Sequence, residues 1–355
     1  MQGGLLLGPD LSGFDTEDLR RQRVAVRRRR RALRRRHPAT STPVSVLLAT
    51  NRPDFVDHAI RTVAAQRNVL VETILVTHGF ELPRKRVRAL RAEGLALTVR
   101  TASASLPLGA VLNIALDCAS GDLVSKMDDD DWYGPHHLED QLLSLHASDA
   151  TLVGVVDEYS YLAELDVTIR HARPARREYR ARRVAGPAMT MRRDDLRALG
   201  GWSPVPFQVD RMLNDVVHHT GGIIHRTHGL GYLRCRHGVG HTWVQPPERF
   251  AHNAVACSPG FHPPPELPLG SLALAHYRNV RAERLSDSLV PRSAPGEEQR
   301  RVGEKRRDVG EELRAQLAVH DPVVERQRQL SDLPHRKCAV VHPRHVPHRA
   351  EAQDR

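Results

Sequence analysis

The chain has 355 residues, of which 27% are charged and 40% hydrophobic, and its mean hydropathy is -0.45. These proportions are typical of globular proteins and exclude collagen-like and wholly disordered chains. The net charge of +11 equals the number of arginines in residues 19–37, a segment that contains no Asp or Glu. The net positive charge therefore resides in one segment and does not indicate a basic folded domain. We predict a flexible basic N-terminal arm over residues 1–42.

The cysteines give no sign of a disulfide framework. Cys118, Cys235, Cys257 and Cys338 are scattered without a CxxC pair, so a thiolate zinc site is not indicated either, and a cytoplasmic location is the simplest expectation. Residues 1–19 lack a basic segment before a long apolar core and are not expected to be a signal peptide. No apolar run approaches the roughly 18 residues that would span a bilayer.

Aromatic residues locate the folded part of the chain. Thirteen of the fifteen lie between Phe55 and Phe261, and none follows Tyr277. The C-terminal segment is rich in Arg, Glu, His and Pro and cannot bury enough apolar surface to offset the entropy of ordering. We therefore predict one folded domain over residues 43–261 and a largely disordered polar tail over residues 262–355.

Short apolar runs alternate with amphipathic segments along the predicted domain. The expected strands are residues 44–49, 73–76, 96–99, 123–127, 184–191 and 223–225. The expected helices are residues 55–67, 84–93, 109–119, 193–199 and 210–219, and a loop is expected over residues 158–183. This alternation predicts an α/β domain with a mostly parallel, mixed central sheet flanked by helices, which binds ligands at the carboxyl ends of its strands.

Four consecutive carboxylates, Asp128 to Asp131, directly follow the strand predicted over residues 123–127. Their mutual repulsion has to be relieved by protonation or by a bound cation. In an extended segment Asp128 and Asp130 project to the same side, where they can face a hard divalent ion such as Mg or Mn. Such an ion leaves coordination positions open for the oxygens of a diphosphate. The alternative is an acidic loop that caps a helix beginning at Pro135.

Several segments resemble, in order, the inverting family 2 glycosyltransferases of the GT-A fold. VSVLLATNRP from residue 44 resembles the opening strand and nucleotide-binding turn, and GAVLN from residue 109 resembles the helix with a donor-side Asn. GDLVSKMDDDD from residue 121 resembles the strand that leads into the DxD motif. MRRDDLRALGGW from residue 191 resembles the segment before the acceptor loop, and Asp210, eleven residues before Gly221, resembles the catalytic acid at a helix start. The resemblance covers residues 44–243.

This resemblance implies metal-dependent transfer of a sugar, with inversion, from a nucleotide-diphosphate sugar to a hydroxyl of a saccharide, lipid-linked or small-molecule acceptor. Asp128 and Asp130 then hold the metal and the diphosphate, and Asp210 takes the acceptor proton as the base. The alternative for Asp210 is a structural role in the first turn of its helix, and Asp215 is the competing base.

The resemblance also assigns the donor pocket, to Thr50, Asn51, Arg52 and Asn113. Family members usually place acids after the second strand to hold the nucleoside, whereas this chain has Thr77 and His78. Both can hydrogen-bond a base or ribose, and a nucleotide other than uridine stays open.

His237 resembles the late His that completes the metal or pyrophosphate site, with His241 as the alternative. Arg234 and Arg236 can neutralise phosphate. Tyr133 and Trp202 are candidates for stacking on a sugar, unless both belong to the core.

Two other classes of function stay open. A zinc-dependent hydrolase would use His225, His228, His237 and His241, although the segment lacks a carboxylate placed as general base. A non-catalytic binding protein would use the arginine arm against nucleic acid or an anionic surface. Nucleic acid is disfavoured because no recognition motif follows the arm and no aromatic residue lies within residues 19–37. A solvated extension without a binding role is the first expectation for the arm. If the arm does bind a partner, peripheral contact with the inner membrane face suits a transferase whose acceptor is lipid-linked.

Overall fold

A computed structural model describes residues 17–37, 42–92, 95–171, 179–237, 250 and 254–267. These residues belong to a compact unit that spans Met1–Arg281. Residues 268–355, most of the predicted tail, lie outside the described residues, as does His241. Within the described residues, no helix is both long and apolar enough to cross a membrane.

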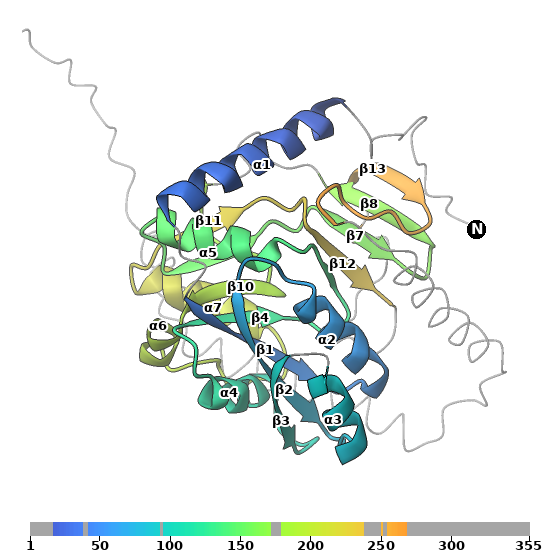
Figure 1. Cartoon of the computed structure of the whole chain (residues 1–355), viewed down its shortest axis with the longest axis vertical. Helices are drawn as coiled ribbons and strands as arrows, with labels where there is room; N and C mark the ends of the chain where they lie inside the picture. Colours follow the sequence, from blue (N-terminus) through green and yellow to red (C-terminus); the bar gives the residue numbers. More distant parts are fainter. Residues whose placement is uncertain are drawn as a thin grey trace, which may run out of the picture. The chain divides into compact units, whose positions relative to one another are not determined.

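An eight-stranded sheet forms the centre of the fold (Figure 1). Its strand order is β3 (Ala96–Ala102), β2 (Leu70–His78), β1 (Pro43–Thr50), β4 (Leu123–Met127), β10 (Ala188–Arg192), β6 (Leu152–Val155), β11 (Ile224–Thr227) and β9 (Tyr179–Ala181). The first four strands are parallel, and β10 runs antiparallel to both of its neighbours. The predicted α/β class with a mostly parallel, mixed central sheet flanked by helices is confirmed.

Helices cover both faces of this sheet because its strands are apolar on both sides. The η1 turn (Pro53–Phe55) leads into α2 (Val56–Ala64), which covers one face with α3 (Arg84–Ala92) and α5 (His137–Ala147). The other face is covered by α4 (Leu108–Cys118), α6 (Arg193–Ala198) and α7 (Val209–His219). Alternate residues of β1 supply the two layers: Val44, Val46 and Leu48 pack with α2, whereas Leu47 packs with α4.

A second sheet lies beside the first and was not predicted. Its order is β13 (Ala254–Pro259), β8 (Val167–His171), β7 (Tyr159–Leu162), β12 (Tyr232–Arg236) and β5 (Trp132–Tyr133). The loop expected over residues 158–183 is therefore wrong where β7, β8 and β9 form. The strand expected from residue 184 begins only at Ala188, because Pro187 has no N–H to donate to a ladder.

The predicted flexible arm is wrong over α1 (Glu17–Arg36), a helix that packs along α5 (Figure 1). Leu19, Val26 and Leu33 are buried on its inner face. Glu266, which lies beyond the domain boundary expected at residue 261, is buried as well and bonds to arginines of α1. The helix and the segment around Glu266 thus belong to the folded body.

Candidate active site

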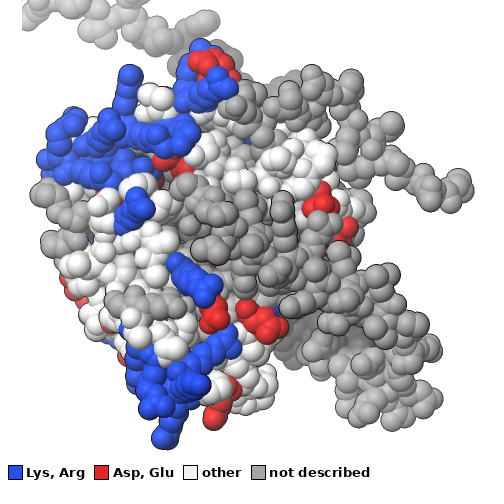
Figure 2. Space-filling view, turned by 45° about the vertical axis from the view of Figure 1, so that its right-hand side comes forward, with Lys and Arg blue, Asp and Glu red and all other residues white. Residues whose placement is uncertain are grey.

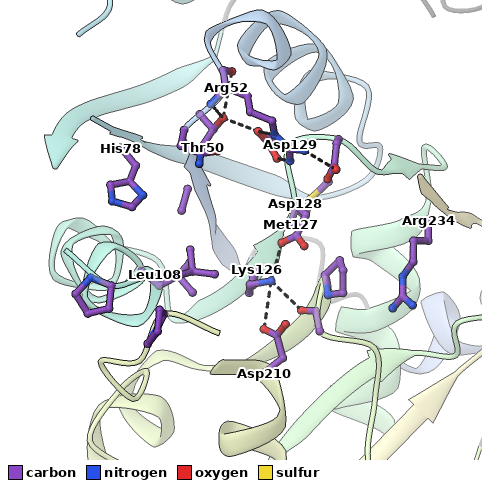
Figure 3. A pocket seen from close by; sticks show the side chains of 18 of the residues that line it. Thr50, Arg52, His78, Leu108, Lys126, Met127, Asp128, Asp129, Asp210 and Arg234 are labelled. Carbon is purple, nitrogen blue, oxygen red and sulfur yellow. Dashed lines mark hydrogen bonds and ion pairs between the residues drawn. The ribbon is translucent and has the colours of Figure 1, made fainter. Parts of the chain in front are cut away.

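The carboxyl ends of β1, β2 and β4 meet at one edge of the sheet and open into a pocket of about 400 Å³ (Figure 3). The position agrees with the expectation for an open parallel sheet. Its charged and polar lining comes from five parts of the chain: Thr50, Asn51, Arg52, His78, Lys126, Asp128, Asp129, Asp130, Asp210, Arg234 and Arg236. Leu106, Leu108 and Pro206 add an apolar wall.

Every carboxylate of the acidic run has a protein partner, and Asp129 and Asp130 share Arg52. Asp128 Oδ1 accepts from Lys126 Nζ at 2.6 Å, and Asp130 Oδ2 accepts from Arg52 Nη1 at 2.8 Å. Asp129 accepts from Thr50 and from Arg52. Asp131 points away from the pocket lining and accepts from Tyr232 Oη at 2.7 Å and the Cys235 amide at 2.8 Å. The alternative of a capping loop is not supported, since no side chain caps α5 at its N-cap residue, His136.

Neighbouring carboxylates keep the arginines of the pocket positively charged. Burial lowers the pKa of Arg52, but the carboxylates of Asp130 and Asp129 outweigh it and raise the pKa above its ordinary value. Burial raises the pKa of Asp129 to about 6 against the opposing effect of Arg52. Arg234 is half-buried beside Asp157, whose charge outweighs the effect of burial and raises the pKa of the guanidinium. The guanidinium groups therefore stay charged where they face the pocket.

Lys126 links the two acidic sides of the pocket. Its ammonium is 2.6 Å from Asp128 Oδ1 and 3.2 Å from Asp210 Oδ1, and it donates to the Gly186 carbonyl at 3.3 Å (Figure 3). Burial lowers the pKa of Lys126, and the two carboxylates raise it by more. The buried ammonium is therefore a fixed positive charge between Asp128 and Asp210.

Asp210 lies in the first turn of α7 and its side chain is 30% exposed at the pocket. Burial raises its pKa, Lys126 opposes this effect, and Asp128 adds to it. A Cβ atom at Gly186 would lie 2.0 Å from Asp210 Oδ2, so only glycine leaves room for the carboxylate in this position. The competing residue Asp215 pairs instead with Arg183 and Arg211 and does not line the pocket.

The pocket thus brings together six of the expected site residues: Thr50, Asn51, Arg52, Asp128, Asp130 and Asp210. Three other expected site residues do not line the pocket. Thr77 is buried and donates to Arg100 O and Thr101. Asn113 bonds to both backbone polar groups of Trp202 and so ties α4 to the segment before α7. His237 packs against the ring of Phe55, with ring centroids 5.2 Å apart.

Tyr133 and Trp202 are core residues and not sugar platforms. They are 4% and 2% exposed, and Tyr133 Oη accepts from the Asp128 amide and donates to Pro187 O. The tyrosine therefore supports the turn at the start of the acidic run.

The histidines expected for a zinc hydrolase serve separate contacts. His228 bonds to Asp140, and His237 packs on Phe55. Within the described residues, no three His, Cys, Asp or Glu side chains are placed to hold a metal ion.

A divalent cation nevertheless fits the donor set in the pocket. Asp128 and Asp130 present hard carboxylate oxygens to the same cavity, and the Asp128 side chain is 34% exposed there. Mg is commonly bound by one or two carboxylates together with substrate phosphates and water, so two protein ligands are enough. The two residues would hold the cation only with a phosphorylated ligand present.

Sequence reasoning assigned no role to Lys126 or Gly186. The signal for Lys126 was available, because it is the one charged residue in a strand whose other positions are buried, and a buried charge requires partners. Gly186 gave no comparable signal, since its contact with Asp210 joins parts of the chain 24 residues apart.

The fold and the acidic pocket define an α/β protein with a ligand site at the carboxyl edge of its sheet. Residues 46–199 match the family model for Glycosyl transferase family 2. A search of curated proteins found no match.

Solved structures with a similar arrangement include S. aureus TarS residues 1–349 in complex with UDP-GlcNAc, at 14% identity and a TM-score of 0.46. They also include GalNAc-T7 with UDP, GalNAc and Mn2+, at 11% identity and a TM-score of 0.46. The matches cover 59% and 55% of this chain, and 64% and 44% of the solved chains. The chain thus matches less than two thirds of either solved chain.

Proposed function

We propose that the protein transfers a sugar from a nucleotide-diphosphate sugar to an acceptor hydroxyl with inversion at the anomeric carbon. The observation that carries this proposal is the position of Asp210, whose carboxylate faces the same pocket as Asp128 and is joined to it through Lys126. Inversion in one displacement needs a base on the acceptor side and charge neutralisation on the leaving-group side. The pocket offers both within one cavity.

On the donor side, two groups of residues are proposed to bind the nucleotide diphosphate. They are the turn after β1, with Thr50, Asn51 and Arg52, and the acidic residues Asp128 and Asp130. A divalent cation, Mn or Mg, held by these two carboxylates would neutralise charge on the leaving diphosphate. Arg234 and Arg236 line the same cavity and add fixed positive charge. His78 lines the cavity at the end of β2 and is proposed to contact the nucleoside.

On the acceptor side, Asp210 accepts the proton of the attacking hydroxyl. Lys126 holds its carboxylate toward the cavity by an ion pair, and the room left by Gly186 permits that position. The apolar wall of Leu106, Leu108 and Pro206 excludes water from one side of the cavity. The acceptor is proposed to be a hydroxyl of a saccharide, a lipid-linked sugar or a small molecule.

A thermal-shift screen with UDP, GDP, CDP and their sugars, with and without Mn, tests the donor side. Wild type is compared with Asp130→Ala and with Asp210→Asn. A ligand at 100 times its Kd stabilises the folded state by about 2.7 kcal/mol, or roughly 5 to 10 °C for a domain of this size. We expect one nucleotide to give such a Mn-dependent shift in wild type and Asp210→Asn, and none in Asp130→Ala.

The Asp210→Asn variant then separates binding from chemistry. It should bind the donor as wild type does but transfer sugar more slowly by about 10² to 10⁴-fold, because it cannot accept a proton. NMR of the product should show an anomeric configuration opposite to that of the donor. Normal transfer by Asp210→Asn, or retention of configuration, would contradict the proposed mechanism; melting of unliganded Asp130→Ala near wild type confirms that this variant folds.

A further inference from the structure

The helix α1 is held in one orientation by bonds from its inner face. Arg30 is 5% exposed and donates to Asp140 through Nε and Nη2, each at 2.6 Å. Arg23 and Arg27 donate to Glu266 at 3.0 and 2.8 Å, and Arg34 pairs with Glu139. These contacts fix which side of the helix faces outward.

The outward side carries a stripe of arginines that the fold does not use. Arg21, Arg28, Arg31 and Arg35, with Val24 among them, are spaced three or four residues apart and are all exposed. This spacing places them on one face over about 20 Å of helix, since an α-helix rises about 1.5 Å per residue. Within the described residues, Arg28, Arg31 and Arg35 have no hydrogen bond or ion pair, and Arg21 has one exposed contact, with Glu17 at 3.9 Å.

The stripe forms a continuous positive surface. Residues 19–37 contain no Asp or Glu, so no acid interrupts it, and Figure 2 shows Lys and Arg side chains gathered over α1. Arginines without protein partners at this density repel one another, and a partner with negative charge relieves that repulsion. The surface is therefore complementary to an anionic partner.

We propose that this stripe binds the surface of a membrane that contains anionic lipids. The inner half of α1 packs against the body, so the exposed guanidinium groups are presented from one side of the helix, which suits a planar surface better than the groove of a duplex. No aromatic residue within residues 19–37 offers stacking to single-stranded bases. The contact is electrostatic and reversible, and it is independent of the sugar transfer proposed above.

The test is co-sedimentation of the full chain with vesicles at about 0.15 M salt. One set of vesicles contains phosphatidylcholine alone, and the other contains in addition roughly 30% phosphatidylglycerol, an anionic lipid of the kind that attracts basic segments. The test variant changes Arg21, Arg28, Arg31 and Arg35 to Gln. The matched control changes Arg61, Arg84, Lys85 and Arg88 to Gln, which removes the same charge from exposed positions on α2 and α3. Thermal melting of each variant, expected near wild type, confirms folding.

Each arginine near an anionic surface strengthens binding by about fivefold, so the α1 variant, which lacks four of them, should bind anionic vesicles on the order of 600-fold more weakly than wild type. The control should stay within a few-fold of wild type, and binding should fall as salt rises. Equal loss in both variants, wild-type binding by the α1 variant, or no binding by wild type would overturn the proposal. So would binding of a 20-nucleotide RNA at the same salt without binding to vesicles.

Discussion

The position of the Asp210 carboxylate depends on two residues outside its own helix. Lys126 holds one of its oxygens, and the missing side chain of Gly186 makes room for the other. Lys126 belongs to β4 and Gly186 to the segment before β10, so the position of Asp210 depends on the fold and not on α7 alone. A first-turn aspartate of a surface helix has no need of either contact.

Gly186→Ala tests this dependence. The new Cβ would lie 2.0 Å from Asp210 Oδ2 and 2.3 Å from its Cγ, so the carboxylate has to move. Because misplacement of a reacting group by about 1 Å can cost about 10²-fold in rate, we expect kcat to fall by about that factor. Donor binding in the thermal-shift assay should change little.

Gly231→Ala is the matched control, because its nearest contact with an added Cβ is 3.8 Å, which is ordinary packing distance. It should leave kcat within about twofold of wild type, since it introduces no clash. Unchanged kcat in Gly186→Ala would mean that the position of Asp210 does not matter for transfer.

At the scale of the element, α1 is where sequence and structure differ most. Eleven arginines in residues 19–37 indicated a solvated arm, yet Leu19, Val26 and Leu33 recur at intervals of seven residues, which is the spacing of one helix face. What sequence alone could not supply is the set of acids that neutralises the inner arginines. Asp140 and Glu266 are 110 and 236 residues away from Arg30.

The ion pair between α1 and α5 predicts a pH dependence. Burial raises the pKa of Glu139, but hydrogen bonds from His136, Arg34 and Asn68 outweigh it and lower the pKa to about 2. A carboxylate with a lowered folded-state pKa stabilises the fold above its ordinary pKa of 4.5, and that contribution is lost as pH falls toward 2. Glu139→Gln should therefore cost about 1 to 3 kcal/mol at pH 7, and progressively less between pH 4.5 and 2.

Urea unfolding of wild type and Glu139→Gln at pH 7, 5, 4 and 3 measures this difference. Glu81→Gln, at an exposed site, serves as the control and should differ little from wild type at any pH. A cost that stays constant down to pH 3 would show that Glu139 acts through packing and not through its charge.

The central strands were predictable and the second sheet was not, for a physical reason. The runs that became β1, β2 and β4 are apolar on both faces, so they stand out in the sequence even without a partner. The strands β7 and β8 carry Tyr159, Ser160, Thr168 and Arg170, whose polar groups are compatible with a loop until the pairing partners are known. The acidic motif and Asp210 were proposed from their order along the chain. The single charge within an otherwise uncharged strand could have pointed to Lys126, whereas the contact of Gly186 with Asp210 needed the fold.

At the scale of the whole molecule, α1 closes the body over the second sheet. Leu19 and Val26 pack in a cluster with Trp132, Tyr159 and Leu267, so the helix joins the N-terminal segment to the last described one. The same helix supplies the positive charges that neutralise buried Asp140 and Glu266. One element therefore combines apolar packing and charge neutralisation inside with a free basic surface outside.

Removal of residues 1–41 should consequently destabilise the body. It would leave Asp140 and Glu266 without their arginines, and breaking a buried pair from one side costs about 3 to 5 kcal/mol. Each kcal/mol lowers Tm by about 2 to 4 °C, and the apolar cluster that the truncation exposes destabilises the body further, so Tm should fall by roughly 10 °C or more.

Arg30→Met in the full chain isolates the charge contribution if the shortened chain fails to fold, and it should lower Tm by several degrees. The outward Gln variant of α1 should melt as wild type does, because its four arginines make no buried contact. If the shortened chain and Arg30→Met both melt within two degrees (about 1 kcal/mol or less) of wild type, α1 is a detachable arm and its inner arginines do not hold the fold together.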